Sequence, residues 1–242
     1  MAVLAKYSVV TVLDYVKNQP KDVAIFRHDV DKKPENALAM AELEKSLGIS
    51  STYYFRTIPD SFDLKVILRI LEMGHEIGYH YEVLDTAEGN YDKAISLFED
   101  NLRLFPCEIS TICMHGNPLT SWDNRDIWSK YDFRKFGIAG EAYLSLDFSK
   151  IAYFSDTGRA WHDRYSIKDI AKGAPAGTTV INHTPDLIRH IPDLTRPACI
   201  VTHPQRWNDD IIPWMAELTG QMARNIGKTG IRYFKRVNGT PR

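Results

Sequence analysis

One stretch of the sequence decides the fold, and it reads Val23-Ala24-Ile25-Phe26-Arg27-His28-Asp29-Val30-Asp31. Its first part predicts a buried strand over residues 23–27, because a short apolar run between turn signals is typical of one. Asp29 and Asp31 follow at the end of that strand, and their spacing of two places both on one face of an extended backbone. Two carboxylates there repel one another unless a cation or a shared proton compensates. The alternative is a helix N-cap followed by a surface acid, since Pro34 opens a predicted helix just downstream.

Short apolar runs alternate with longer amphipathic ones over nearly the whole chain. Further strands are predicted at residues 52–55, 75–80, 110–114, 151–154, 178–181 and 198–202. Helices are predicted at residues 34–47, 61–73, 91–104, 121–131, 166–172, 185–190 and 209–225, with Ser61 and Ser121 as N-caps. This alternation is typical of a parallel sheet, closed into a barrel or doubly wound. No repeat or linker-like change of composition interrupts it, so residues 1–242 are predicted to form one domain.

Charge and composition narrow the possible partners. A formal net charge of -1 and an isoelectric point of about 6.7 provide no global field that would attract nucleic acid or an anionic membrane. The three cysteines are odd in number and lack metal-ligand spacing, which favours free thiols in a reducing compartment. No signal peptide is recognisable, and no stretch is apolar enough for a membrane span. We therefore expect a cytoplasmic protein, while the sequence leaves its oligomeric state open.

Polar side chains follow most of the predicted strands, where parallel α/β folds place their catalytic groups. These residues are His80, Glu82, His115, Asn117, Asp156, His183 and His203. The segment from His75 to His80 is not a zinc-protease signature, because its histidines are five apart and its glycines oppose a helix. On a strand, His80 and Glu82 share one face and His75 points the other way. His80 is therefore a ligand candidate, Glu82 a possible companion, and His75 a packed structural histidine.

Three elements resemble the polysaccharide deacetylase (NodB-homology) family, the fold of carbohydrate esterase family 4. They are the pair Asp29 and Asp31, the G-H-E-I-G-x-H segment at residues 74–80, and the late strand end Ile200-Val201-Thr202-His203-Pro204. More narrowly, the chain resembles a deacetylase-like branch found among bacterial surface-polysaccharide genes. That branch shows strings close to Arg27-His28-Asp29-Val30-Asp31, Met114-His115-Gly116-Asn117-Pro118, Asp156-Thr157-Gly158-Arg159 and His203-Pro204-Gln205-Arg206-Trp207.

The resemblance implies a distorted (β/α) barrel of about seven parallel strands. It also implies a divalent metal, usually zinc, that activates water to cleave an N-acetyl amide on a sugar. Carried over to this chain, Asp29 would be the general base, Asp31 and His80 metal ligands, and His203 the general acid. The chain departs from the family at Leu84, where the family has a second metal histidine. Either another group completes the site or the site binds metal poorly. Glu82 is the first substitute and His115 the second, since zinc accepts carboxylate and imidazole ligands.

Other positions receive supporting roles. Asp156 is expected to hold the His203 ring in its working tautomer, with a turn residue before Gly158 as the alternative. The family's arginine that orients the base has no counterpart in the matching loop, which offers His115 and Asn117 instead. Substrate contacts are expected from residues that follow strand ends, with packing as the alternative for the tryptophans. These residues are His115, Asn117, Arg159, Trp161, His183, Arg206 and Trp207.

The predicted function is a metal-dependent hydrolase that removes an N-acyl group, N-acetyl in the family, from a sugar or surface-polysaccharide precursor. A nucleotide- or lipid-linked saccharide of lipopolysaccharide or O-antigen biosynthesis is the expected substrate class. Two alternatives stay open at this point. One is a catalytically inactive sugar-binding module on the same fold, and the other is a metal-dependent hydrolase of a non-sugar amide.

Overall fold

A single curled sheet of parallel strands organises the protein. The computed structural model describes residues 7–161, 168, 173 and 181–237. The sheet has the strand order β6-β5-β4-β3-β2-β8-β7, and β1 pairs with the first part of β2. The strands are β1 (Ser8–Val10), β2 (Val23–Val30), β3 (Thr52–Phe55), β4 (Glu76–Tyr81), β5 (Thr111–Met114), β6 (Gly140–Glu141), β7 (Ala152–Ser155) and β8 (Ala198–Thr202). All of these pairs are parallel, as the sequence predicts.

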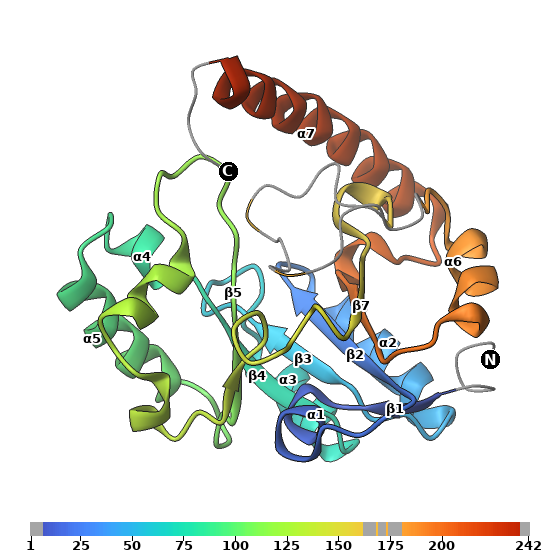
Figure 1. Cartoon of the computed structure of the whole chain (residues 1–242), viewed down its shortest axis with the longest axis horizontal. Helices are drawn as coiled ribbons and strands as arrows, with labels where there is room; N and C mark the ends of the chain where they lie inside the picture. Colours follow the sequence, from blue (N-terminus) through green and yellow to red (C-terminus); the bar gives the residue numbers. More distant parts are fainter. Residues whose placement is uncertain (1–6, 162–167, 169–172, 174–180, 238–242) are drawn as a thin grey trace.

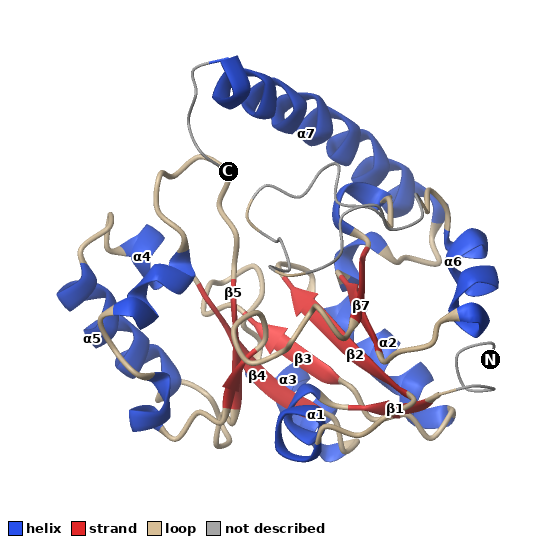
Figure 2. Cartoon of the chain, in the orientation of Figure 1, coloured by secondary structure: helices blue, strands red, loops and turns tan. Residues whose placement is uncertain are grey.

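Helices connect most of the strands and surround the sheet (Figures 1 and 2). The α-helices are α1 (Val12–Asn18), α2 (Pro34–Ser46), α3 (Leu64–Glu72), α4 (Val83–Thr86), α5 (Tyr91–Leu102), α6 (Thr184–His190) and α7 (Ile211–Val237). Short 3-10 turns include η1 (Asn124–Ser129), η2 (Phe133–Phe136), η3 (Thr157–Arg159), η5 (Ile191–Asp193) and η6 (Pro204–Arg206). The edge strands β6 and β7 do not pair with each other within the described residues, so the sheet stays open. This architecture confirms the predicted distorted (β/α) barrel.

Strand β2 lies in the interior of the sheet and is buried on both faces, as strands of parallel sheets commonly are. Its neighbours are β3 and β8, which pair with it through Asp29 and Tyr54 on one side and His28 and Thr202 on the other. The carboxyl ends of these three strands therefore meet, and Asp29 lies in the middle of them.

Gly78 explains part of the motif at residues 74–80. A Cβ atom at this position would lie 2.3 Å from two ring carbons of Tyr54 on the neighbouring strand β3. Glycine is therefore the residue that lets the Tyr54 ring lie flat across β4. The hydroxyl of Tyr54 is 2.7 Å from Thr111 Oγ1 on β5, so the ring crosses β4 and links the strands on either side of it.

Two predicted helix caps are wrong. The N-cap of α3 is Asp63, whose carboxylate accepts from the backbone of Lys65 and of Val66, rather than Ser61. Ser61 instead donates to the carbonyl of Val30, 2.5 Å away, and fixes the end of β2. Likewise, η1 begins after Asp123 rather than at Ser121. In both cases a carboxylate two residues downstream takes the capping position, because it reaches the free amides with an ionised acceptor.

The remaining differences concern short or late elements. Strands β1 and β6 and helices α1 and α4 were not expected from the sequence. The last helix is longer than residues 209–225, since α7 continues to Val237. The helix predicted at 166–172 and the strand predicted at 178–181 fall almost entirely outside the described residues. Among the helices that are described, none combines the length and apolar character needed to cross a membrane.

Candidate active site

The carboxyl ends of the strands surround a cavity of about 550 Å³, a size suited to a small ligand (roughly 300–1,000 Å³). Residues from β2 and β4, from the segments that follow β2, β3, β4, β5, β7 and β8, and from α7 line it. The predicted site residues among them are Asp29, Asp31, His80, Glu82, His115, Asn117, His203 and Arg206. The structure thus brings most of the predicted site together in one place.

Asp31, His80 and His115 form a compact group, called here the Asp–His–His cluster. Asp31 Oδ1 lies 3.6 Å from His80 Nε2 and 3.6 Å from His115 Nε2. One potential ligand atom of each residue lies within 4.8 Å of the others. The three residues come from the ends of β2, β4 and β5, and the curl of the sheet brings β2 toward the other two although β3 lies between.

Both imidazoles of the cluster are oriented through their second ring nitrogen. His80 Nδ1 is 3.0 Å from the carbonyl oxygen of Cys113. His115 Nδ1 forms an ion-pair contact with Glu82, 3.1 Å from Oε2, with an angle outside hydrogen-bond geometry. Each ring thereby turns its Nε2 toward Asp31, and carbonyl or carboxylate contacts of this kind are typical of metal-binding histidines.

Glu82 therefore supports His115 and lies outside the Asp–His–His cluster. Arg56, at the end of β3, binds the Glu82 carboxylate through Nε and Nη2 at 3.0 and 2.6 Å. Burial alone would raise the pKa of Glu82, but His115 and Arg56 outweigh it and lower the pKa to about 2. Of the two substitutes predicted for the third ligand, the geometry thus places His115 in the cluster.

The Asp–His–His cluster has the features expected of a cation site. Asp31 Oδ1 is buried and has no hydrogen-bond partner among the described residues, while Gln205 donates to Oδ2 at 2.9 Å. Ligands about 2.1 Å from a tetrahedral zinc ion lie about 3.4 Å apart, close to the 3.6 Å separations observed. Burial would raise the pKa of Asp31, but His80, His203 and His115 hold it well below its usual range. The donor set of one ionised carboxylate and two imidazoles fits zinc.

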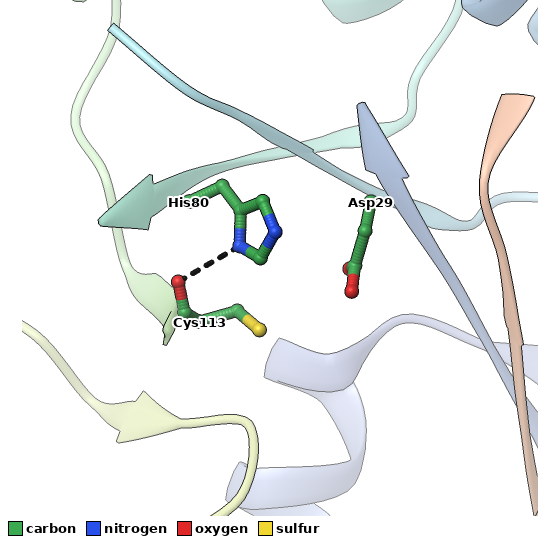
Figure 3. A group of neighbouring side chains, drawn as sticks. All are labelled: Asp29, His80 and Cys113. Atoms are coloured by element: carbon green, nitrogen blue, oxygen red, sulfur yellow. Dashed lines mark hydrogen bonds between the residues drawn. The ribbon is translucent and has the colours of Figure 1, made fainter. Parts of the chain in front are cut away.

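A second group of possible ligands lies beside the first and shares His80 with it. Figure 3 shows Asp29, His80 and Cys113, all three of them buried. In this group the Asp29 carboxylate already binds Arg27, which donates from Nε to Oδ1 at 2.8 Å and from Nη2 to Oδ2 at 2.6 Å. Because this bidentate pair compensates the charge of Asp29, the Asp–His–His cluster is the better cation site.

Arg27 was not among the predicted site residues, yet it is fully buried beside the reactive groups. It lies on the same face of β2 as Asp29 because the two are two residues apart. Its guanidinium also donates to the hydroxyl of Tyr143 at 3.1 Å and lies 4.5 Å from the centre of that ring. Burial would raise the pKa of Asp29, but the Arg27 charge and the nearby histidines lower it. Asp29 is thus ionised and held in one orientation.

Asp156 organises the opposite wall of the cavity. Its Oδ1 lies 2.6 Å from His203 Nδ1 and accepts from Arg206 at 2.7 Å, while its Oδ2 accepts from Trp207 Nε1 at 2.8 Å. Burial would raise the pKa of Asp156, but Arg206 and His203 lower it to about 2. The arrangement fixes the His203 ring through Nδ1 and leaves Nε2 for the cavity.

The other predicted substrate contacts divide into three groups. Asn117 and Arg206 line the cavity. Arg159 donates to the backbone of Arg206 at 3.1 Å, and Trp207 is tied to Asp156, so both support the wall from behind it. His183 is exposed, precedes α6 and is not among the residues that line the cavity.

Leu84 lies in the short helix α4 and is fully buried. Its backbone amide donates to Asn124 Oδ1 at 2.9 Å, and its side chain belongs to the main hydrophobic core. The chain turns into α4 directly after Glu82, so the position four residues after His80 is directed into the core.

Comparison with solved structures gives a likeness to carbohydrate esterase family 4. A family pseudoenzyme from Bacillus anthracis shares 12% identity with a TM-score of 0.45, over 85% of this chain and 60% of that one. A candidate polysaccharide deacetylase from Mycobacterium smegmatis shares 12% identity with a TM-score of 0.46, over 83% and 82% of the two chains. The family 4 carbohydrate esterase PdaA of Bacillus subtilis shares 13% identity with a TM-score of 0.36, over 89% and 76%.

This chain thus spans less than two thirds of the length of the Bacillus anthracis structure. No family model and no curated protein sequence matches it. The roles of its site residues therefore rest on the geometry of the site itself.

The charged and polar residues of the site that the sequence did not predict include Arg27, Arg56, Gln205 and Arg224. For two of them a signal was present. Arg27 shares the alternation that places Asp29 and Asp31 on one face, and Arg56 directly follows a predicted strand. Gln205 and Arg224 reach the site from a turn and from α7, whose positions no local pattern specifies.

Proposed function

We propose that this protein is a metal-dependent hydrolase that removes an N-acyl group, N-acetyl in the simplest case, from a sugar. One observation carries the proposal. The Asp–His–His cluster, the ionised Asp29 and the His203–Asp156 pair lie around one cavity of about 550 Å³. Amide hydrolysis needs an activated water, a base to take its proton and an acid to protonate the leaving amine. The cavity offers a candidate for each of these needs.

Asp31, His80 and His115 would hold a divalent cation, with zinc suited to their nitrogen and oxygen donors. When bound, such a cation polarises an acyl oxygen and lowers the pKa of water. Glu82 would hold His115 in the required tautomer, and Arg56 would keep Glu82 ionised.

Asp29 would accept the proton of the attacking water at a carboxylate oxygen. Arg27 fixes the plane of that carboxylate through two short hydrogen bonds, so the base is positioned before substrate arrives. Each Asp29 oxygen retains a second lone pair after binding Arg27. Because Arg27 also lowers the pKa of Asp29, the transfer is effective only from water that is already acidified.

His203 would donate a proton from Nε2 to the leaving amine nitrogen. Asp156 holds Nδ1 at 2.6 Å, which fixes the tautomer and the orientation of the ring. Arg206 and Trp207 also donate to the Asp156 carboxylate, so this one carboxylate orients His203 and both of these side chains.

The residues that line the cavity favour a substrate in which the sugar carries an anionic group. Arg206 and Arg224 line the cavity, and the Arg224 side chain is 46% exposed. Guanidinium groups bind phosphate in a bidentate manner. A nucleotide- or lipid-linked saccharide would supply such a phosphate next to the acylated sugar.

The test is an assay of purified protein for release of acyl product, after chelation and after added zinc. Substrates are N-acetyl sugar nucleotides, with a non-sugar acetamide as comparison. We expect zinc-dependent turnover of a sugar nucleotide, lost in both Asp31→Ala and His115→Ala. Absence of bound zinc, or turnover of the non-sugar amide alone, would contradict the proposal.

One observation favours a second candidate, a sugar-binding module without catalysis. Both oxygens of Asp29 are engaged by Arg27, which weakens Asp29 as a base. The same experiment separates the two functions, because a binding module would retain sugar nucleotide in equilibrium dialysis without any release of product.

A further inference from the structure

Glu82 stands at the start of helix α4 but does not cap it. It occupies the position just before the helix, where a polar side chain commonly accepts from the free backbone amides of the first turn. Its carboxylate makes no such bond. Arg56 binds that carboxylate through Nε and Nη2, and His115 Nδ1 lies 3.1 Å from its Oε2. The first amides of α4 therefore need another acceptor.

Asn124 supplies that acceptor from a position 40 residues after Leu84. Its Oδ1 accepts from the backbone amides of Leu84 and Asp85 at 2.9 and 3.3 Å. Its Nδ2 donates to Asp85 Oδ2 and to the backbone carbonyl of His115, both at 2.9 Å. The orientation of the Asn124 amide follows from these partners, since backbone amides can only donate and a backbone carbonyl can only accept. The residue is 2% exposed, so these bonds are made away from solvent.

These bonds join the two segments that carry the contact between Glu82 and His115. The backbone amide of His115 donates to the carbonyl of Tyr81 on β4 at 2.8 Å, and its carbonyl accepts from Asn124. The backbone of His115 is thus held on both sides, although the residue lies beyond the end of β5. In the other segment, Asn124 caps α4 and leaves the Glu82 carboxylate to Arg56 and His115.

Asn124 is itself held in place by the turn η1, of which it is the first residue. The carboxylate of Asp123 accepts from the backbone amide of Arg125 at 2.9 Å, and the backbone amide of Asp123 donates to Asp126 Oδ2 at 2.9 Å. This reciprocal capping box fixes the start of the turn. Ile127 in the same turn is fully buried in the main hydrophobic core. The Asn124 amide is therefore a firmly anchored link between α4 and the end of β5.

We propose that Asn124 is a positioning residue for the Asp–His–His cluster. It holds His115 through the backbone carbonyl, and by capping α4 it leaves Glu82 to orient the His115 ring. This inference rests on the cation site of the proposed function. The alternative is that Asn124 only stabilises the fold. In that case its loss would lower the free energy of unfolding but leave the zinc affinity of the folded protein unchanged.

The test is a zinc titration of the full chain carrying Asn124→Ala, by isothermal titration calorimetry, with circular dichroism to check that the variant is folded. We expect the zinc dissociation constant to rise about 10- to 100-fold, as for other groups that orient a metal-binding histidine. Cobalt(II) gives a second readout, because its visible spectrum depends on the number and arrangement of its ligands. The cobalt spectrum of Asn124→Ala should shift from that of the wild type toward that of His115→Ala.

Asn101→Ala is the matched control. Asn101 on α5 donates to the hydroxyl of Tyr79 at 2.7 Å and is not among the residues that line the cavity. Its replacement should lower the free energy of unfolding and leave the zinc affinity and the cobalt spectrum unchanged. Asn124→Asp is the second variant if Asn124→Ala does not fold. It keeps an acceptor for the two amides of α4 but cannot donate to His115, so it should also weaken zinc binding.

Wild-type zinc affinity and cobalt spectrum in a folded Asn124→Ala or Asn124→Asp would overturn the role of Asn124 and leave the proposed function standing. An equal loss of zinc affinity in Asn101→Ala would also overturn it, because general destabilisation would then explain both results. A wild-type protein that binds no zinc would overturn the proposed function and the role of Asn124 together.

Discussion

Replacing Arg27 with methionine is expected to lower the free energy of unfolding by about 3–5 kcal/mol at pH 7. Arg27 is fully buried, and the Asp29 side chain is 5% exposed. Without the guanidinium, Asp29 becomes a buried carboxylate that has lost both of its charged hydrogen bonds. Methionine keeps most of the side-chain volume, so the loss reports the charge rather than a cavity.

The free energy of unfolding lost in Arg27→Met should increase as the pH rises. In the wild type the pKa of Asp29 is lower in the folded than in the unfolded state. Its contribution to the free energy of unfolding is therefore present above the unfolded pKa of about 3.9 and is lost as the pH falls through the folded pKa. In Arg27→Met, burial without the guanidinium raises the folded pKa above the unfolded value. The folded variant then binds a proton that the unfolded chain lacks, and its stability falls as pH rises, by at most about 1.4 kcal/mol per pH unit.

Urea unfolding followed by tryptophan fluorescence at pH 7 and pH 5 measures both effects. The difference in the free energy of unfolding between wild type and Arg27→Met should shrink at pH 5, where the buried and unpaired Asp29 carboxylate of the variant is partly protonated. The double variant Arg27→Met with Asp29→Asn removes both charges and should recover most of the stability. The reasoning is refuted if Arg27→Met loses less than about 1 kcal/mol, or if its loss is unaffected by Asp29→Asn.

Three further predictions test other parts of the structure. His115→Ala should abolish tight zinc binding, whereas Glu82→Gln should weaken it about 10- to 100-fold. Isothermal titration calorimetry distinguishes the two results. Equal losses of zinc affinity would contradict the role of Glu82 as a support for His115. Burial would raise the pKa of Glu44, but His28 outweighs it and lowers the pKa to about 2. The free energy of unfolding of the wild type should therefore fall by about 3 kcal/mol more than that of Glu44→Gln as the pH falls from 5 to 2. Gly78→Ala should destabilise by about 1–3 kcal/mol, because its Cβ would meet the Tyr54 ring; an unchanged urea midpoint would count against this packing.

The sequence predicts those parts of the fold that depend on long or repeated patterns. Continuous apolar runs specify β2 and β8, and the carboxyl-edge rule brings Asp31 and His203 to one cavity although they are far apart in the chain. Strands β1 and β6 are only three and two residues long, which is too short for any periodicity to be visible.

The sequence does not predict those features of the site that depend on contacts between different strands and helices. Alternation places Glu82 and His80 on one face of a strand, and this made Glu82 the first choice for the third ligand. The structure shows Arg56 from the neighbouring strand binding Glu82, an interaction that depends on two side chains meeting in space. In the same way, the spacing of apolar residues in α7 predicts an amphipathic helix but not which face is turned outward.

The position of Leu84 bears directly on whether the proposed metal site is complete. Strands β4 and β5 pair through Tyr81 and Met114, so the residues after them, Glu82 and His115, end side by side. The amide of His115 donates to the carbonyl of Tyr81 at 2.8 Å and fixes this neighbourhood. An imidazole can therefore reach the site from the adjacent strand, while the chain after Glu82 turns into α4 and buries Leu84. Because Glu82 then contacts His115, the third donor depends on a carboxylate for its orientation and basicity. The buried Leu84 is thus compatible with a cation site whose third ligand comes from the end of β5.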